Sequence, residues 1–130
     1  EKAQEAGQYM NDYYQCYGLT PGETFTENQN TIEWFNQCVP MLKKGPVVMI
    51  THHAPSYTSV KGRYKESKEA YANRLEEFIH KNPNITLWCH GHIHHNNNYK
   101  IGECTVLANP RGYEDYELNP EFMLTKELIV

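Results

Sequence analysis

Two similar segments organise this sequence: residues 45–53, GPVVMITHH, and residues 85–95, ITLWCHGHIHH. Each contains a short apolar run that indicates a strand buried on both faces. Each run leads directly into a cluster of histidines, and the two clusters hold six of the seven histidines in the chain. Because neutral imidazole is the commonest protein ligand for transition metals, this pattern indicates a metal site.

The segment between these strands predicts a helix over residues 68–80, with Ser67 as its N-cap. Its apolar stripe consists of Tyr71, Leu75, Phe78 and Ile79. Strand 47–51, helix 68–80 and strand 85–89 form a βαβ unit, in which the two strands are parallel. Both strands then end at the same edge of the sheet, where ligands bind in open α/β sheets, so His52 and His92 are expected to meet there.

The flanking segments are less regular. Residues 1–45 are expected to form a helical lead-in, with a turn at Pro21-Gly22, a capping box from Thr26 to Gln29 and a helix that Pro40 ends or kinks. That helix carries Ile32, Phe35, Val39 and Leu42 at helical spacing. Beyond the second histidine cluster, Gly102-Glu103 suits a type II′ hairpin between strands 99–101 and 104–107. A loop at 109–113 and a final strand over 122–130 complete the chain.

Composition fits one domain of an α/β protein. The chain has 130 residues, 39% of them hydrophobic, and a formal net charge of -4. No apolar run approaches the roughly 20 residues of a membrane span, and residues 1–5 lack the features of a signal peptide. No lysine or arginine run indicates nucleic-acid binding. The four cysteines show no CxxC pairing, so we expect free thiols and a cytoplasmic location.

The histidine spacing predicts three convergent nitrogen ligands. His92 and His94 lie two residues apart, which places both side chains on one side of an extended segment, and Gly91 lets the backbone turn sharply. With His52, they suit a single catalytic zinc with an open position, or half of a two-metal site completed by carboxylates. The only aspartates, Asp12 and Asp115, do not lie where a bridging carboxylate is expected.

These residues resemble a known family. Residues 91–94, GHIH, are similar to the GHxH motif of the calcineurin-like metallophosphoesterases, and Thr51-His52 after a strand resembles their preceding TH motif. The resemblance covers residues 45–113, where segment 109–113 also resembles a downstream part of some members. It implies a four-layer α/β/β/α sandwich and metal-dependent hydrolysis of phosphate monoesters or diesters.

The resemblance also implies what the chain lacks. The family's DxH, GDxxD and GNH(E/D) motifs are absent from the sequence. The 130 residues are therefore expected to form a single partial domain, the C-terminal half of such a phosphoesterase, with residues 1–45 as lead-in and 46–130 as the βαβ unit and later strands. A missing N-terminal half or a second chain would supply the Asp, His and Asn ligands. An unpaired sheet edge would favour a homo-oligomer.

Carried over by residue, the resemblance implies two metal ions, of Mn, Fe, Zn or Ni. His52 and His92 would bind one ion and His94 the other. His53 is expected to contact substrate or to orient His52, and Arg111 is a candidate phosphate contact because its planar guanidinium suits phosphate oxygens.

Three further histidines and two loop tyrosines are not assigned as metal ligands. His90 and His95 are expected to pack or to support ligands, and His80 to favour the C-terminal end of its helix. Tyr57 and Tyr64 either pack within their loop or line a substrate pocket.

Two other functions stay open. The chain is alternatively a catalytically incomplete metal-binding or interaction module. Residues 90–94, HGHIH, also superficially resemble the alternating histidines of histidine-triad nucleotide hydrolases, but Gly91 and the following asparagines disfavour that interpretation, which has no use for His52.

Overall fold

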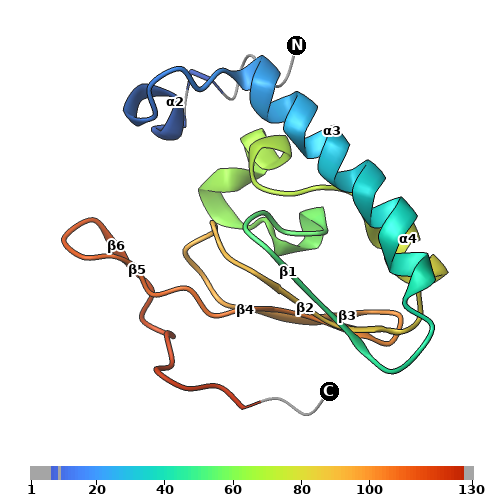
Figure 1. Ribbon diagram of the computed structural model, residues 1–130. Coiled ribbons are helices and arrows are strands. Elements are labelled where there is room, and N and C mark those ends of the chain that lie inside the picture. Colours follow the sequence, from blue (N-terminus) through green and yellow to red (C-terminus); the bar gives the residue numbers. More distant parts are fainter. Residues whose placement is uncertain (1–6, 9, 128–130) are drawn as a thin grey trace.

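The computed structural model describes residues 7, 8 and 10–127, apart from the side chains of residues 63–66. The helices are α2 (Asp12–Gln15), α3 (Pro21–Cys38) and α4 (Glu76–Lys81), with 3₁₀ segments at Val39–Met41, Tyr57–Ser59 and Gly62–Ala70. The strands are β1 (Val47–Thr51), β2 (Ile85–His90), β3 (Asn97–Ile101), β4 (Cys104–Ala108), β5 (Gly112–Tyr113) and β6 (Glu117–Leu118). Figure 1 shows α3 and α4 together on one side of the main sheet.

The main sheet has four strands in the order β1-β2-β4-β3. β1, β2 and β4 are parallel, and β3 is antiparallel to β4. This mixed sheet with its helices confirms the predicted α/β class. The predicted hairpin is also present, with Gly102 at a φ of 57°, the positive value that a type II′ turn needs at that position.

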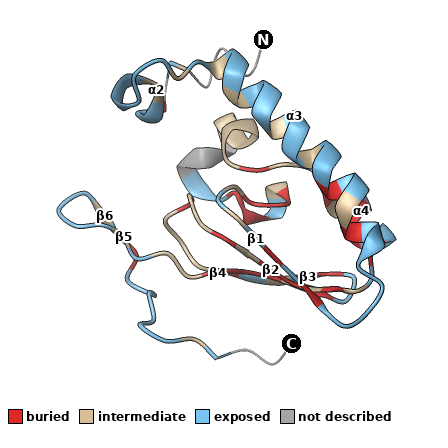
Figure 2. Ribbon diagram, in the orientation of Figure 1, coloured by how far each residue is buried: buried red, intermediate tan, exposed pale blue. Residues whose placement is uncertain are grey.

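The core lies between the sheet and the two longer helices. Phe35 of α3 stacks on Phe78 of α4, and both pack edge-on against Trp88 of β2, which is fully buried. Figure 2 shows buried residues along the strands and exposed residues along the outer side of α3. On the opposite side of the sheet, Val48 and Ile50 of β1 are 44% and 79% exposed. The helices therefore cover one face only, and the prediction that the strand at 47–51 is buried on both faces is wrong.

The structure corrects the start of α3. The helix begins at Pro21, so the predicted turn there is wrong. Its capping box joins Thr20 to Glu23, whereas the predicted cap, Thr26, lies inside the helix and donates only to the carbonyl of Gly22. Proline suits the first helical position because its missing N–H has no helical partner there.

The crossover between β1 and β2 is also less helical than predicted. Residues 68–70 belong to a 3₁₀ segment, Ser67 has non-helical dihedral angles, and α4 spans only Glu76–Lys81. The backbone N–H groups of Asn73 and Leu75 donate to Ala54 and Pro55 in the loop after β1. These long-range bonds replace the helical ones, while Leu75, Phe78 and Ile79 still enter the core as predicted.

The predicted last strand is wrong where the structure describes it. Residues 122–127 form no strand, and residues 128–130 lie outside the described residues. Asn109 holds this segment instead, through two hydrogen bonds to the backbone of Met123. In the predicted loop 109–113, Gly112 and Tyr113 pair with β6.

Two smaller expectations concern cysteines and membranes. All four cysteines are free. No helix within the described residues has the length and apolar character needed to cross a bilayer.

Candidate functional site

The histidine clusters meet at the edge where the parallel strands end. Thr51 of β1 lies opposite His90 of β2, and the backbone N–H of Gly91 donates to the carbonyl of His52 at 3.0 Å. This bond joins the two strand-end loops directly. The βαβ topology therefore brings together residues that are 40 positions apart.

His52 and His92 are in direct contact. His52 Nε2 lies 3.1 Å from His92 Nδ1, and the ring centroids are 4.7 Å apart. Two nitrogens that each lie about 2.1 Å from one metal ion are about 3.0 to 3.4 Å apart, depending on the ligand angle. The observed separation fits two imidazole ligands of one transition-metal ion.

The backbone at His92 is unusual. Its φ is 62°, in the left-handed region that few residues other than glycine adopt. The next residue, Ile93, is fully buried beside Ala54, Val60 and Ala72. This packing holds the strained conformation, which turns the His92 ring back toward His52.

His92 is also held in its neutral form. Burial, followed by the nearby His53 and His52, lowers the pKa of His92 to about 4. Its Nε2 is buried without a hydrogen-bond partner in the described part of the chain. If Nε2 carries the proton, Nδ1 presents its lone pair toward His52, which is the tautomer that a metal ligand needs.

His53 lies beside the pair. Its ring centroid is 4.6 Å from that of His92 and 5.3 Å from that of His52. Burial and the neighbouring His52 lower its pKa. A neutral imidazole in this position can donate a hydrogen bond to a molecule beside His52 and His92, or accept one from it.

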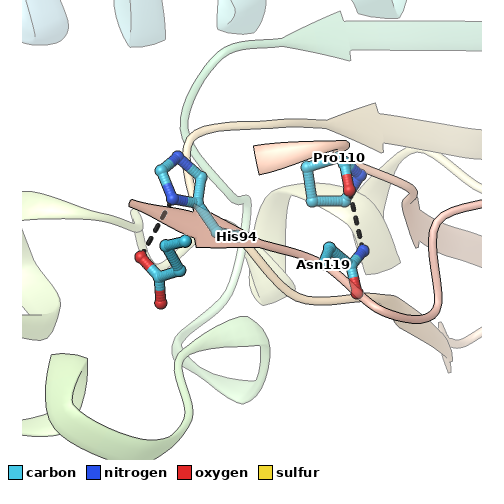
Figure 3. A network of polar contacts seen from close by, with 4 residues as sticks. His94, Pro110 and Asn119 are labelled. Carbon is cyan, nitrogen blue, oxygen red and sulfur yellow. Dashed lines mark hydrogen bonds and ion pairs between the residues drawn. The ribbon is translucent and has the colours of Figure 1, made fainter. Parts of the chain in front are cut away.

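The structure places His94 differently from the sequence-based expectation. Residues 91–96 are bent rather than extended, because of the left-handed turn at His92 and the bond from Ile93 N–H to the carbonyl of Gly91. His94 Nδ1 lies 3.0 Å from Glu117 Oε2. Figure 3 marks the contact of the His94 ring with this carboxylate by a dashed line. The same view shows Asn119, which bonds the carbonyl of Pro110 and so anchors the segment that carries Glu117.

His90 and His95 belong to a network behind the site. His90 Nε2 lies 2.9 Å from Ser59 Oγ, whose other neighbour is Tyr99 Oη at 2.7 Å. His95 Nε2 lies 2.9 Å from the carbonyl of Ser59. Burial lowers the pKa of His90. Both histidines therefore fasten the 3₁₀ turn Tyr57–Ser59 against β2 and β3.

The structure does not bring Arg111 to the histidines. Its guanidinium is 3.2 Å from Glu114, and the side chain is 59% exposed. Tyr57 packs within its loop with Lys68 over its ring, and the side chain of Tyr64 lies outside the described ones. His80 is exposed at the end of α4.

Sequence reasoning missed the residues that face the histidines from the N-terminal segment. His52, His53 and His92 line a pocket together with side chains that include Met10, Asp12, Leu19 and Phe25. No local pattern marks these residues, because contacts between segments so far apart leave no periodicity in the sequence.

The described residues do not complete a metal centre. Among them, no group of three or more histidine, cysteine, aspartate or glutamate side chains is arranged to hold a metal ion. The site therefore contains one pair of imidazoles, His52 and His92, whose nitrogens are separated as two ligands of one ion are. His94 instead contacts the carboxylate of Glu117.

Comparisons with known proteins agree with the motifs. The family model described as calcineurin-like phosphoesterase matches residues 5–96. The chain is 25% identical over 139 aligned positions to the uncharacterized protein L509 of Acanthamoeba polyphaga mimivirus, covering 92% of this chain and 48% of that protein. No solved structure matches the chain.

Proposed function

Because the chain belongs to the calcineurin-like phosphoesterase family, we propose that it supplies histidine ligands to a two-metal centre that hydrolyses phosphate monoesters or diesters. The family is generally dependent on two metal ions. The observation that carries the proposal is the 3.1 Å separation of His52 Nε2 and His92 Nδ1. The two nitrogens come from separate strand ends and converge as ligands of one ion do.

His52 and His92 would hold one ion, and His94 the other. Metal-binding histidines usually donate their second ring N–H to a carboxylate, which fixes the ring. Glu117 stands in that relation to His94 Nδ1 and leaves His94 Nε2 for the metal. When bound, the two ions would polarise a phosphate oxygen and activate a water for attack.

The chain's own residues would prepare the site. The burial that keeps His92 neutral leaves a lone pair for the metal without prior loss of a proton. His53, beside the pair, would contact the phosphate or support His52. Arg111 would reach the phosphate only after leaving Glu114.

The remaining ligands would come from a missing N-terminal half of the sandwich or from a second chain. The DxH, GDxxD and GNH(E/D) motifs of the family are absent from the sequence, which supports this proposal. The chain also spans about half the length of the curated relative that it matches. We therefore propose that these residues form the C-terminal half of a four-layer domain. Alone, they are expected to show very low or no hydrolysis.

A second candidate is a catalytically incomplete metal-binding or interaction module. The lack of a three-ligand group among the described side chains favours it. The histidine-triad alternative has less support, because His90 Nε2 is engaged by the hydroxyl of Ser59, which is fully buried.

Metal binding tests the proposal. Titration of the purified chain with Mn²⁺ or Zn²⁺, followed by calorimetry, should show binding that weakens at least about tenfold in His52→Ala and His92→Ala. His80→Ala, an exposed histidine outside the site, is the matched control. Equal affinities in all four proteins would contradict the proposed ligands.

Hydrolysis separates the two candidates. Addition of the missing half should produce metal-stimulated hydrolysis of p-nitrophenyl phosphate, whereas a binding module would stay inactive. Robust hydrolysis by the 130 residues alone would show that the centre is complete and that the proposed division is wrong.

A further inference from the structure

The pocket beside the histidines has two unlike walls. One wall is the strand-end loops with His52, His53 and His92, and the other comes from the segment that precedes and opens α3. The second wall is apolar where Met10, Leu19 and Phe25 line it. A molecule held at the histidines by a phosphate group would therefore place its remaining atoms against this apolar wall.

We infer that this pocket binds the organic group of the substrate, and that this group is a single aromatic ring, or an apolar group of that size, without a negative charge of its own. The inference rests on the proposed function, because it takes the histidine wall to be the phosphate end. It adds a substrate class, an uncharged aryl or similar phosphate ester.

The size of the pocket sets the first limit. Its volume is about 200 Å³. An apolar cavity of about 150 Å³ accommodates benzene. One aromatic ring with a small substituent therefore fits beside the histidines.

The charges around the pocket set the second limit. Asp12 contributes a carboxylate to the lining, and no lysine or arginine is among the lining residues that the structure describes. A second anionic group on the substrate would be repelled by the carboxylate of Asp12.

The apolar wall is held in place by side-chain bonds. Tyr13 Oη lies 2.8 Å from Thr24 Oγ1, which connects α2 to the first turns of α3. The capping box of Thr20 and Glu23 fixes the start of the same helix. Phe25, one turn later, is 56% exposed and so has a face that a ligand can cover.

Binding of three phosphonates, which cannot be hydrolysed, tests the inference. Calorimetry with Mn²⁺ and this chain assembled with the missing half would compare methylphosphonate, phenylphosphonate and 4-carboxyphenylphosphonate. We expect phenylphosphonate to bind about tenfold more tightly than methylphosphonate, because the ring covers apolar surface. The added carboxylate should weaken binding about fivefold relative to phenylphosphonate, through repulsion from the acidic lining.

Variants locate the effect. Phe25→Ala should remove most of the advantage of the phenyl ring and leave methylphosphonate affinity unchanged. Trp34→Ala, an exposed aromatic change on the same helix outside the pocket lining, should keep the full advantage. Asp12→Asn should reduce the discrimination against the carboxylate, whereas Glu33→Gln, an exposed acid of α3, should not.

The outcomes distinguish the two proposals. Equal binding of methylphosphonate and phenylphosphonate, or an unchanged preference in Phe25→Ala, would overturn the pocket assignment while leaving the phosphate site in place. Tighter binding of the carboxylated compound would overturn the charge limit. Failure of all three compounds to bind would remove the proposed phosphate site, and the pocket inference with it.

Discussion

At the scale of residues, His94 and Glu117 form the contact that most directly concerns the proposed second metal ligand. Both side chains are partly buried, with exposed fractions of 17% and 28%, and His94 Nδ1 lies 3.0 Å from Glu117 Oε2. A carboxylate in this position fixes the ring and raises its basicity toward a metal. The contact was not foreseen, because Glu117 is 23 residues away and lies in a two-residue strand.

Glu117→Gln is therefore expected to weaken the metal affinity of the proposed two-metal centre, or its metal-stimulated activity, by about 10-fold to 100-fold. The measurement is a metal titration of the variant against the native protein. Glu114→Gln, an exposed acid of the same hairpin, is the matched control. A native affinity in Glu117→Gln would show that His94 does not depend on this carboxylate.

Three wholly or partly buried histidines also predict a pH dependence of stability in the metal-free protein. The folded state lowers the pKa of His53, His90 and His92, the last to about 4. Well above about pH 6.5 these rings are neutral in both the folded and the unfolded state, so their protonation does not lower the free energy of unfolding. As the pH falls below that value, the unfolded chain binds protons that the folded protein does not bind, and the free energy of unfolding therefore decreases.

Urea unfolding with a chelator present should show this loss. From about pH 7.5 to about pH 5, His92 alone should cost about 2 kcal/mol. His92→Asn should flatten the pH dependence, whereas His80→Asn should leave it unchanged. A stability that rises as the pH falls over this range would contradict the assigned direction of the shifts.

At the scale of elements, the start of α3 shows how two similar local signals compete. Thr20 and Thr26 each precede an acidic or amide residue at cap spacing, and only Thr20 forms the capping box. The decisive feature is Pro21, whose fixed φ suits the first helical turn. Once the helix begins there, Thr26 is an interior residue.

This difference gives a paired test. Thr20→Ala should lower the free energy of unfolding by about 1 kcal/mol, because the N–H of Glu23 loses its acceptor. Thr26→Ala should be neutral or slightly stabilising, because alanine favours helix interiors. Urea unfolding measures both, and the reverse ranking would place the helix start at Thr26.

The 3₁₀ turn Tyr57–Ser59 is the element that braces the histidine edge from behind. The hydroxyl of Ser59 joins His90 to Tyr99, and its carbonyl accepts from His95. Ser59 is fully buried, so its partners have no water to replace it.

Ser59→Ala should therefore cost about 1 to 3 kcal/mol of unfolding free energy, since it leaves polar groups of His90 and Tyr99 unsatisfied. Thr58→Ala, in the exposed neighbour, is the control and should have little effect. Urea unfolding of both variants provides the comparison. A loss no larger than that of Thr58→Ala would show that the bond contributes no net stability.

At the scale of the whole molecule, the sheet is covered on one face only. β1 forms an edge of the main sheet, and its residues Val48 and Ile50 point away from the helices. Exposed apolar strands of this kind favour pairing with another chain or segment. The arrangement agrees with the proposal that further structure packs on this face.

The isolated 130 residues are accordingly expected to self-associate as their concentration rises. Ile50→Lys should shift the mass measured by light scattering toward the monomer. Leu124→Lys, an equally exposed change outside the sheet, should not. A clean monomer of the native chain at high concentration would contradict the expected association.

What the sequence determined by itself follows from local periodicity and from one topological rule. The runs at 47–51 and 85–89 specify strands, although the first is buried on one face only. The parallel crossover between them requires both histidine clusters to reach one edge. The helical spacing also predicts the apolar stripe of Leu75, Phe78 and Ile79, although helix α4 is shorter than the predicted helix 68–80. These features need no knowledge of distant contacts.

Only the tertiary structure decided the details of the site. Burial of Ile93 bends the chain after His92. The His94 side chain therefore contacts Glu117 and does not lie on the same side of the segment as His92. Backbone bonds to Ala54 and Pro55 replace the first turns of the crossover helix. Met10 and Phe25 form a pocket wall through contacts with segments far along the chain. Such long-range pairings depend on how the whole chain packs, and no local pattern encodes them.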